Sequence, residues 1–189
     1  MITTLPALRQ LYGCARERSL KKEIPALDVH ATRFMGLSPF VVLASSDADG
    51  HMDASPRGGE PGFVKVLDAH TILVPDAPGN NRLDTLENII ATGRLGLLFM
   101  VPGMDETLRV NGRAVLSTDP ADLALCVDAR RTPALVIRLT VESVYLHCGK
   151  AFMRSKLWDA SRQVDRAQLP SMAEMLRDQI RTFKGEDIE

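Results

Sequence analysis

Six or seven short apolar runs, most of them separated by only a few turn-forming residues, constrain the fold of this chain. They occupy residues 40–45, 51–54, 63–67, 71–74, 94–101, 107–118 and 134–148. The later runs alternate apolar and polar side chains, as half-buried strands do. Connections as short as residues 47–50 and 68–70 suit antiparallel neighbours, because parallel strands need a crossover of a dozen residues or more. We therefore expect a mainly β chain with flanking helices (α+β), folded as an antiparallel barrel of six or seven strands.

Helical periodicity marks both ends of the chain and several connections between strands. Asp28 is expected to cap one helix and Gly36 to end it, while Gly93 is expected to end another. Asp119 and Pro120 are typical of a helix start. Residues 56–62 hold three glycines and two prolines, so we expect an irregular loop there. The predicted helices cover residues 3–22, 28–35, 82–92, 119–127 and 171–183, and residues 150–158 are predicted to form a turn followed by a short helix.

The 189 residues suit a single domain with a real core. We divide it into a helical N-terminal arm (residues 1–36), the barrel (residues 37–158) and a C-terminal helical segment (residues 159–189). The arm could pack on a neighbouring subunit, or it could be an ordinary surface helix; its sequence leaves both open.

Composition excludes several classes of function. The net charge of −1 gives no electrostatic basis for binding nucleic acid or an anionic membrane. No apolar stretch approaches the roughly 20 residues that span a bilayer, and no signal peptide is recognisable. Cys14, Cys126 and Cys148 are odd in number and lack CxxC spacing, so we expect reduced thiols in a cytoplasmic protein.

A small set of polar residues next to glycine and proline suits a phosphate group. Arg57 follows Ser55 in a glycine-rich stretch, and Asn81 and Arg82 stand at an expected helix start. A guanidinium fork together with free N–H groups at a helix start is a common way to bind phosphate. Each residue has a simpler interpretation as well: Asn81 as a plain N-cap, Arg82 as a solvated arginine and Arg57 as an exposed loop charge.

No catalytic side chain can be assigned. The four histidines are scattered, and His147 with Cys148 has no partner motif for a metal. Asp47 and Asp49 are better explained by a turn than by hydrolysis.

These segments together resemble the pyridoxamine 5′-phosphate oxidase-like family of FMN-binding split barrels. The resemblance covers roughly residues 30–158 and follows the family order. Its segments are residues 41–45, Asp-Ala-Asp-Gly at 47–50, Ser55-x-Arg57, Asn81-Arg82, Gly-Leu-Leu-Phe at 96–99 and residues 107–114. The resemblance implies a split barrel, FMN as cofactor and a homodimer with the cofactor at the subunit interface.

The resemblance also implies which residues contact FMN. Arg57 matches the arginine that reaches the phosphate or ring edge, with Ser55 and Gly58 beside it. Independently of the family, a flavin needs hydrogen bonds to its pyrimidine edge, which backbone groups of residues 63–66, Val64 among them, could give. The segment at residues 148–158 is similar to an end-of-barrel segment in an uncharacterised branch of the family. The predicted cofactor-binding residues are Ser55, Arg57, Gly58, Val64, Asn81, Arg82, Lys150, Arg154, Ser155 and Trp158.

The implied activity is that of an FMN-dependent oxidoreductase acting on a small molecule, with a reduced nicotinamide as a candidate electron donor. Residues 159–189 contain neither His nor Trp, which departs from the C-terminal segment of the pyridoxamine phosphate oxidases themselves. Oxidation of pyridoxamine phosphate is therefore not the expected reaction. A non-catalytic flavin- or haem-binding carrier or sensor stays open as the alternative. Trp158 has the simpler interpretation of a core or interface anchor, and Lys150 that of a surface lysine.

Overall fold

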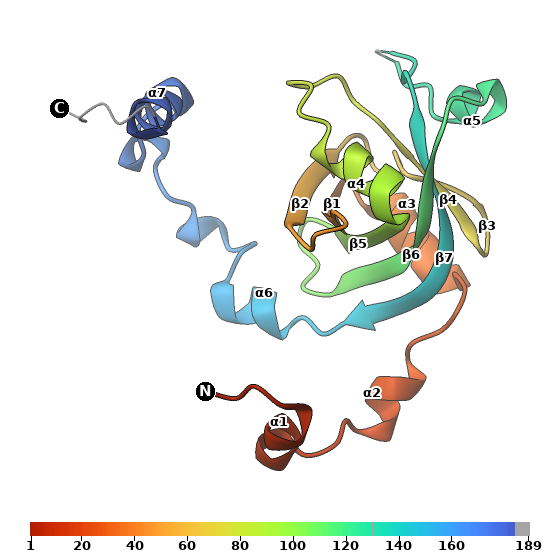
Figure 1. Ribbon diagram of the computed structural model, residues 1–189, viewed down its shortest axis with the longest axis vertical. Coiled ribbons are helices and arrows are strands. Elements are labelled where there is room, and N and C mark those ends of the chain that lie inside the picture. The colour runs from red at the N-terminus through yellow and green to blue at the C-terminus, as the bar shows by residue number, and fades with distance from the viewer. Residues whose placement is uncertain (130, 184–189) are drawn as a thin grey trace. The chain divides into compact units, whose positions relative to one another are not determined.

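The computed structural model describes residues 1–129 and 131–183, and its centre is one sheet of seven antiparallel strands (Figure 1). The strand order is β2-β1-β5-β6-β7-β4-β3, so β2 and β3 are the edges. This confirms the predicted antiparallel barrel with flanking helices. The strands are β1 (Phe40–Ser46), β2 (Met52–Gly58), β3 (Lys65–Asp68), β4 (Thr71–Pro75), β5 (Arg94–Met100), β6 (Thr107–Ser117) and β7 (Val136–His147).

The main core cluster draws buried residues from the strands of the sheet, including β1, β5 and β6, and from helices that pack against them. Val41 and Leu43 of β1 are fully buried and alternate with more exposed neighbours. Phe99 and Leu108 from the central strands are also fully or almost fully buried. Met35 from α3 (Val29–Leu37) is buried in the same cluster.

The helices before the barrel differ in detail from the prediction. The expected helix at residues 3–22 is two helices, α1 (Leu5–Tyr12) and α2 (Glu17–Lys21), because Gly13 ends the first with a φ of 70°. The Asp28 carboxylate accepts the Ala31 N–H at 2.7 Å, which confirms the predicted N-cap. Gly36 does not end α3, which continues to Leu37.

β2 corrects the prediction that residues 56–62 are irregular throughout. The strand continues through Pro56 and Arg57 to Gly58, pairing with β1 along its whole length. Proline has no backbone N–H, so in a central strand it would leave a neighbouring strand without a hydrogen-bond donor. In an edge strand the proline nitrogen can face the free edge, where no partner strand needs a donor. The composition argument failed here because it ignored that position in the sheet.

The helix that follows β4 starts later than expected. α4 (Asp84–Thr92) begins two residues after Arg82, and its N-cap Leu83 has a left-handed backbone with a φ of 59°. Asn81 is therefore not the N-cap. Gly93 ends α4 in the left-handed conformation, as predicted.

Three polar residues spaced along α4 attach it to the hairpin of β1 and β2. The Thr85 hydroxyl donates to Asp53 at 2.6 Å, and the Asn88 amide donates to the Ser45 hydroxyl at 3.0 Å. The Thr92 hydroxyl lies 3.3 Å from the Ser46 carbonyl. Because Thr85, Asn88 and Thr92 recur every three or four residues, they occupy one face of the helix. These bonds fix the start of α4 beside β2.

α5 (Pro120–Leu125) is capped by Asp119, whose carboxylate accepts the Ala121 N–H at 2.9 Å, as predicted. It ends at Leu125, two residues earlier than expected. Buried Asp122 accepts hydrogen bonds from Arg138 at 2.7 Å and from Ser117 at 2.8 Å, which attaches α5 to β6 and β7.

The chain forms two compact units, and α6 (Lys150–Ser155) ends the first. The second begins at Lys156 and contains two short 3-10 turns, η1 (Ala160–Arg162) and η2 (Arg166–Gln168), followed by α7 (Met172–Phe183). Ser171 and Glu174 exchange side-chain-to-backbone hydrogen bonds at the start of α7, which is a capping box. Within the described residues, no helix is both long enough and apolar enough to cross a membrane.

Candidate functional site

A cavity of about 390 Å³ lies between the edge strand β2 and the segment that leads into α4. It is lined by Asp53, by Ser55–Arg57 and by residues 76–86. Four residues predicted from the sequence, Ser55, Arg57, Asn81 and Arg82, therefore lie around one space. They come from two segments of the chain, and the sequence alone did not show that the two segments meet.

Arg57 reaches the cavity because of the strand pattern of β2. Asp53, Ser55 and Arg57 are half-buried and alternate with exposed residues, so their side chains share one face of the strand. Nη1 of Arg57 donates to the Ser55 hydroxyl at 2.6 Å and to the Pro56 carbonyl at 3.0 Å. Within the described residues, Nε and Nη2 of Arg57 make no hydrogen bond, so part of its donor fork is available to a ligand.

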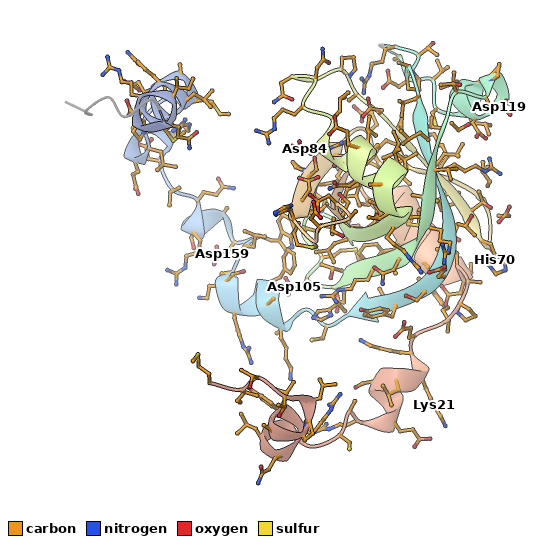
Figure 2. The ribbon with its side chains drawn as sticks, in the orientation of Figure 1. Lys21, His70, Asp84, Asp105, Asp119 and Asp159 are labelled. Atoms are coloured by element: carbon orange, nitrogen blue, oxygen red, sulfur yellow. The ribbon has the colours of Figure 1, made fainter. Side chains whose placement is uncertain are left out.

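The second wall of the cavity has an unusual backbone. Asn81 and Leu83 both have a φ of 59°, a left-handed conformation that is uncommon for residues other than glycine. The Asn80 side chain accepts the Arg82 N–H at 3.1 Å, and Nε of Arg82 pairs with the Asp84 carboxylate at 2.9 Å. Asp84 is labelled at the start of α4 in Figure 2. Backbone strain of this kind is concentrated at ligand-binding sites.

The N-terminus of α4 opens on this cavity without a side-chain cap. Leu83 has no side-chain acceptor, and Asp84, Thr85 and Leu86 of the first turn line the space. Helix-start N–H groups and the positive end of the helix dipole favour an anion there. Together with two guanidinium groups, they can bind a phosphate.

Sequence reasoning missed the acidic residues of the cavity, which are Asp53, Asp76 and Asp84. Two of them already have partners, since Asp53 accepts from Thr85 and Asp84 from Arg82. The alternation of Asp53 with Ser55 and Arg57 was the signal that could have identified Asp53. An anion that binds Arg82 has to compete with Asp84.

The remaining predicted residues lie elsewhere. Gly58 borders a smaller neighbouring cavity, and Val64 is buried in the core. Lys150, Arg154 and Ser155 are exposed on α6 and do not line the large cavity. Trp158 belongs to the second unit. Cofactor contacts by these residues stay predictions.

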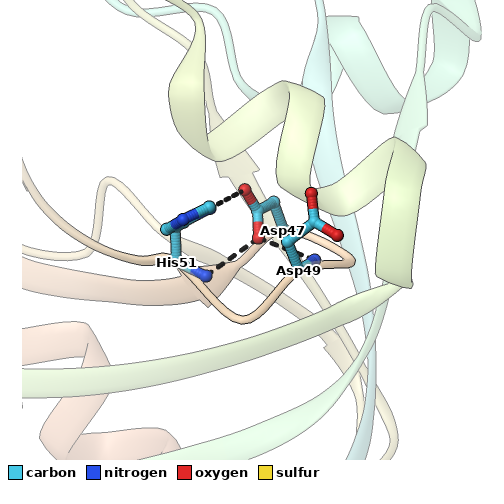
Figure 3. Close-up of side chains that lie close together, drawn as sticks. All are labelled: Asp47, Asp49 and His51. Atoms are coloured by element: carbon cyan, nitrogen blue, oxygen red, sulfur yellow. Dashed lines mark hydrogen bonds and ion pairs between the residues drawn. The ribbon is translucent and has the colours of Figure 1, made fainter.

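A group of metal-ligating side chains occurs in the turn between β1 and β2. The ligand atoms of Asp47, Asp49 and His51 lie within 4.8 Å of one another (Figure 3). One Asp47 oxygen accepts the N–H groups of Asp49 and His51, both at 2.9 Å, and the other lies 2.7 Å from Nδ1 of His51. The hydrogen bonds from His51 lower the pKa of Asp47 below its ordinary value. These bonds stabilise the turn, so the predicted turn explains the group without a metal.

Comparison with known proteins gives the family. The family model described as pyridoxamine 5′-phosphate oxidase matches residues 27–148, which is more than half of the chain. The chain belongs to this family. Membership supports a flavin-binding, oxidoreductase-like class and does not name a substrate. No curated protein matches the chain.

Solved structures agree with the family at the level of the fold. Two crystal structures of HupZ from Group A Streptococcus have 17% sequence identity to this chain and TM-scores of 0.53 and 0.52. They cover 64% and 62% of this chain and 98% and 91% of their own. General Stress Protein 26 from Bacillus anthracis str. Sterne is 12% identical with a TM-score of 0.46, covering 62% of this chain and 94% of its own.

Proposed function

We propose that this protein binds FMN in the large cavity and is an FMN-dependent oxidoreductase acting on a small molecule. One observation carries the proposal: Ser55, Arg57, Asn81 and Arg82 converge on one cavity at the uncapped start of α4. The family supports a flavin, and this set of residues specifically suits a flavin that carries a phosphate.

The residues fit that cofactor in size and in charge. A cavity of about 390 Å³ falls within the range of roughly 300–1,000 Å³ typical of small-molecule sites. Arg57 would bind the phosphate with its free donors, since its Nη1 is already held in place by Ser55 and Pro56. Arg82 would exchange its contact with Asp84 for a phosphate oxygen. The first-turn N–H groups of α4 would complete the anion site.

When bound, a flavin accepts and donates hydride or single electrons, which no side chain of this cavity can do. The chain itself binds and orients. The hydrogen bond between Thr85 and Asp53 fixes α4 beside β2, so the two walls keep their spacing. The carboxylates of Asp53 and Asp76 disfavour a second anion in the rest of the cavity.

We also propose a homodimer, because the N-terminal helices bury nothing in the single chain. Every residue from 1 to 23 is exposed, including Leu5, Leu8 and Leu11 of α1. An isolated eight-residue helix is not stable in water, so this apolar face needs a partner surface. A second copy of the chain is the partner that the family resemblance implies. Light scattering of the full chain and of a variant with Leu8→Glu and Leu11→Glu tests this, and a monomeric full-length protein would contradict it.

The three cysteines are free, which supports a reducing, cytoplasmic location.

A visible spectrum of the purified protein tests the proposed function. The two absorption bands of oxidised flavin, or their perturbation when FMN is added to colourless protein, are the expected result. Consumption of NADH or NADPH by the yellow protein then distinguishes an enzyme from a carrier. A colourless protein that leaves the fluorescence of added FMN unchanged would rule the proposal out.

A further inference from the structure

A smaller cavity of about 160 Å³ adjoins the large one. Pro56, Arg57 and Ala77 line both, so a molecule in the smaller cavity lies next to whatever occupies the larger one. The remaining lining comes from the last residues of β2 and β4, the start of β3, the segment before β3 and the loop that follows α5. We call this space the small cavity.

Positive charge is concentrated in the small cavity. Arg57, Lys65 and Arg131 line it with a single carboxylate, Asp128, although the whole chain has a net charge of −1. Asp128 accepts the backbone N–H of Arg131 at 3.0 Å, which holds the loop in place. The excess of cations is therefore local and belongs to this cavity.

Two of these cations have donors to spare. Nζ of Lys65 donates to the Gly62 carbonyl at 2.9 Å, and an ammonium has three donors. Arg131 is half-buried, yet no described residue accepts a hydrogen bond from its guanidinium. Partial burial of an unpaired cation costs free energy, which a bound anion would offset.

The other walls are apolar and chemically inert. Phe63, Pro75 and Val127 contribute side chains without polar groups. Cys126 also lines the space, and burial raises the pKa of its thiol, so the thiol stays neutral. The cavity thus combines an anion-binding group with apolar surface and offers no nucleophile.

We propose that the small cavity is the substrate subsite and that the substrate is a small organic acid. Its carboxylate is held by Lys65 and Arg131, and its carbon body packs against Phe63 and Val127. The inference rests on the proposed function, because the acid is a substrate only if a flavin occupies the adjoining large cavity.

Calorimetric titration of the FMN-free and the FMN-loaded protein tests this subsite. The probes are benzoate, the smaller acid propionate and the neutral isostere benzamide. At least one acid should bind, and benzamide should bind at least about tenfold more weakly than benzoate, since it lacks the charge. Lys65→Met and Arg131→Met should each weaken acid binding by about tenfold, and Arg131→Lys should recover most of the loss.

The affinity for FMN serves as the internal reference. Lys65 and Arg131 do not line the large cavity, so both variants should bind FMN within about twofold of the parent protein, a difference of roughly 0.4 kcal/mol. Arg131 lies outside every helix and strand, so its variant remains informative even if Lys65→Met destabilises β3. Arg33→Met, which removes an exposed cation on α3 outside both cavities, is the matched control and should bind the acids as the parent does.

The inference is overturned if neither acid binds, if benzamide matches benzoate, or if Arg33→Met weakens binding as much as Arg131→Met. Failure of this inference is distinguishable from failure of the proposed function. If the protein binds FMN but shows neither the preference for acids over benzamide nor weaker acid binding in Lys65→Met and Arg131→Met, only the subsite is refuted. If the acids bind as expected but the protein does not bind FMN, the proposed FMN site is refuted and the small cavity remains an anion-binding site.

Discussion

Replacing Arg57 by methionine tests the phosphate contact, because the cofactor is available with and without that group. FMN and riboflavin share the ring and the ribityl chain, and only FMN carries the phosphate. If Arg57 binds the phosphate, Arg57→Met should weaken FMN binding and leave riboflavin binding almost unchanged. An effect through misfolding would weaken both ligands equally.

The structure sets the size of the effect. Arg57 is half-buried and held by Ser55 and Pro56, so little side-chain entropy remains to be lost when it binds. A hydrogen bond to a charged group contributes about 1.5–3 kcal/mol, which corresponds to a loss of about 10- to 150-fold in affinity. Arg82 is 73% exposed and must first leave Asp84. Its replacement should therefore cost less, about 1 kcal/mol or below.

The assay is quenching of flavin fluorescence, with both ligands titrated into the parent protein, Arg57→Met and Arg82→Met. The expected order of FMN affinity is parent, then Arg82→Met, then Arg57→Met. The reasoning would be refuted by an Arg57→Met protein that binds FMN as tightly as the parent, or that loses riboflavin and FMN to the same extent.

Three further predictions concern the scaffold and the turn. Asn88→Ala removes the hydrogen-bond partner of the buried Ser45 hydroxyl and should lower the free energy of unfolding in urea by about 1–3 kcal/mol, whereas Glu87→Ala on the exposed side should change it by less than about 0.5 kcal/mol. Gly112→Ala places a Cβ 2.0 Å from the Thr140 carbonyl and should destabilise the protein by about 1–3 kcal/mol. Gly36→Ala, which meets nothing within 4 Å on a helix, should instead stabilise it by about 0.4–1 kcal/mol, and equal melting temperatures for these two variants would contradict the prediction. The His51 hydrogen bonds lower the pKa of Asp47 below its ordinary 3.8, so their contribution to the turn is present above that pH and is lost as the pH falls through the lowered value. His51→Ala should raise the Asp47 pKa in an NMR titration, and an unchanged value would exclude the side-chain bond as a cause.

The strands were predictable from the sequence because their signals are local. Alternation in residues 134–148 and turn residues at 47–50 act over a few positions, and β7 and the first hairpin follow them. The helix ends were predictable where one residue decides the backbone, as Asp28, Gly93 and Asp119 do. The prediction of a loop at Pro56 was wrong because proline is tolerated in an edge strand and not in a central one. Strand order depends on the whole sheet, so the local sequence does not show which strand is at the edge.

The candidate site was half predictable for the same reason. Ser55, Arg57, Asn81 and Arg82 were predicted together as a phosphate site, but the packing of β2 and α4 that brings the two segments together is not a local property of the sequence. Thr85 was missed because a threonine in a helix carries no motif, and Asp53 because its alternation with Ser55 and Arg57 was overlooked. The small cavity joins residues as distant as Arg57 and Arg131, and no spacing rule connects them.

Pro56 also limits how two copies of this chain can associate. An edge strand normally exposes a row of N–H and C=O groups on which another strand can be added, in an oligomer or in an aggregate. A proline in the middle of β2 removes one donor from that row and interrupts the ladder that an incoming strand would need. Sheet extension across β2 is thus disfavoured, whereas β3, the other edge, has no proline. A strand of a neighbouring molecule is therefore less able to pair beside Ser55–Arg57, which line the large cavity.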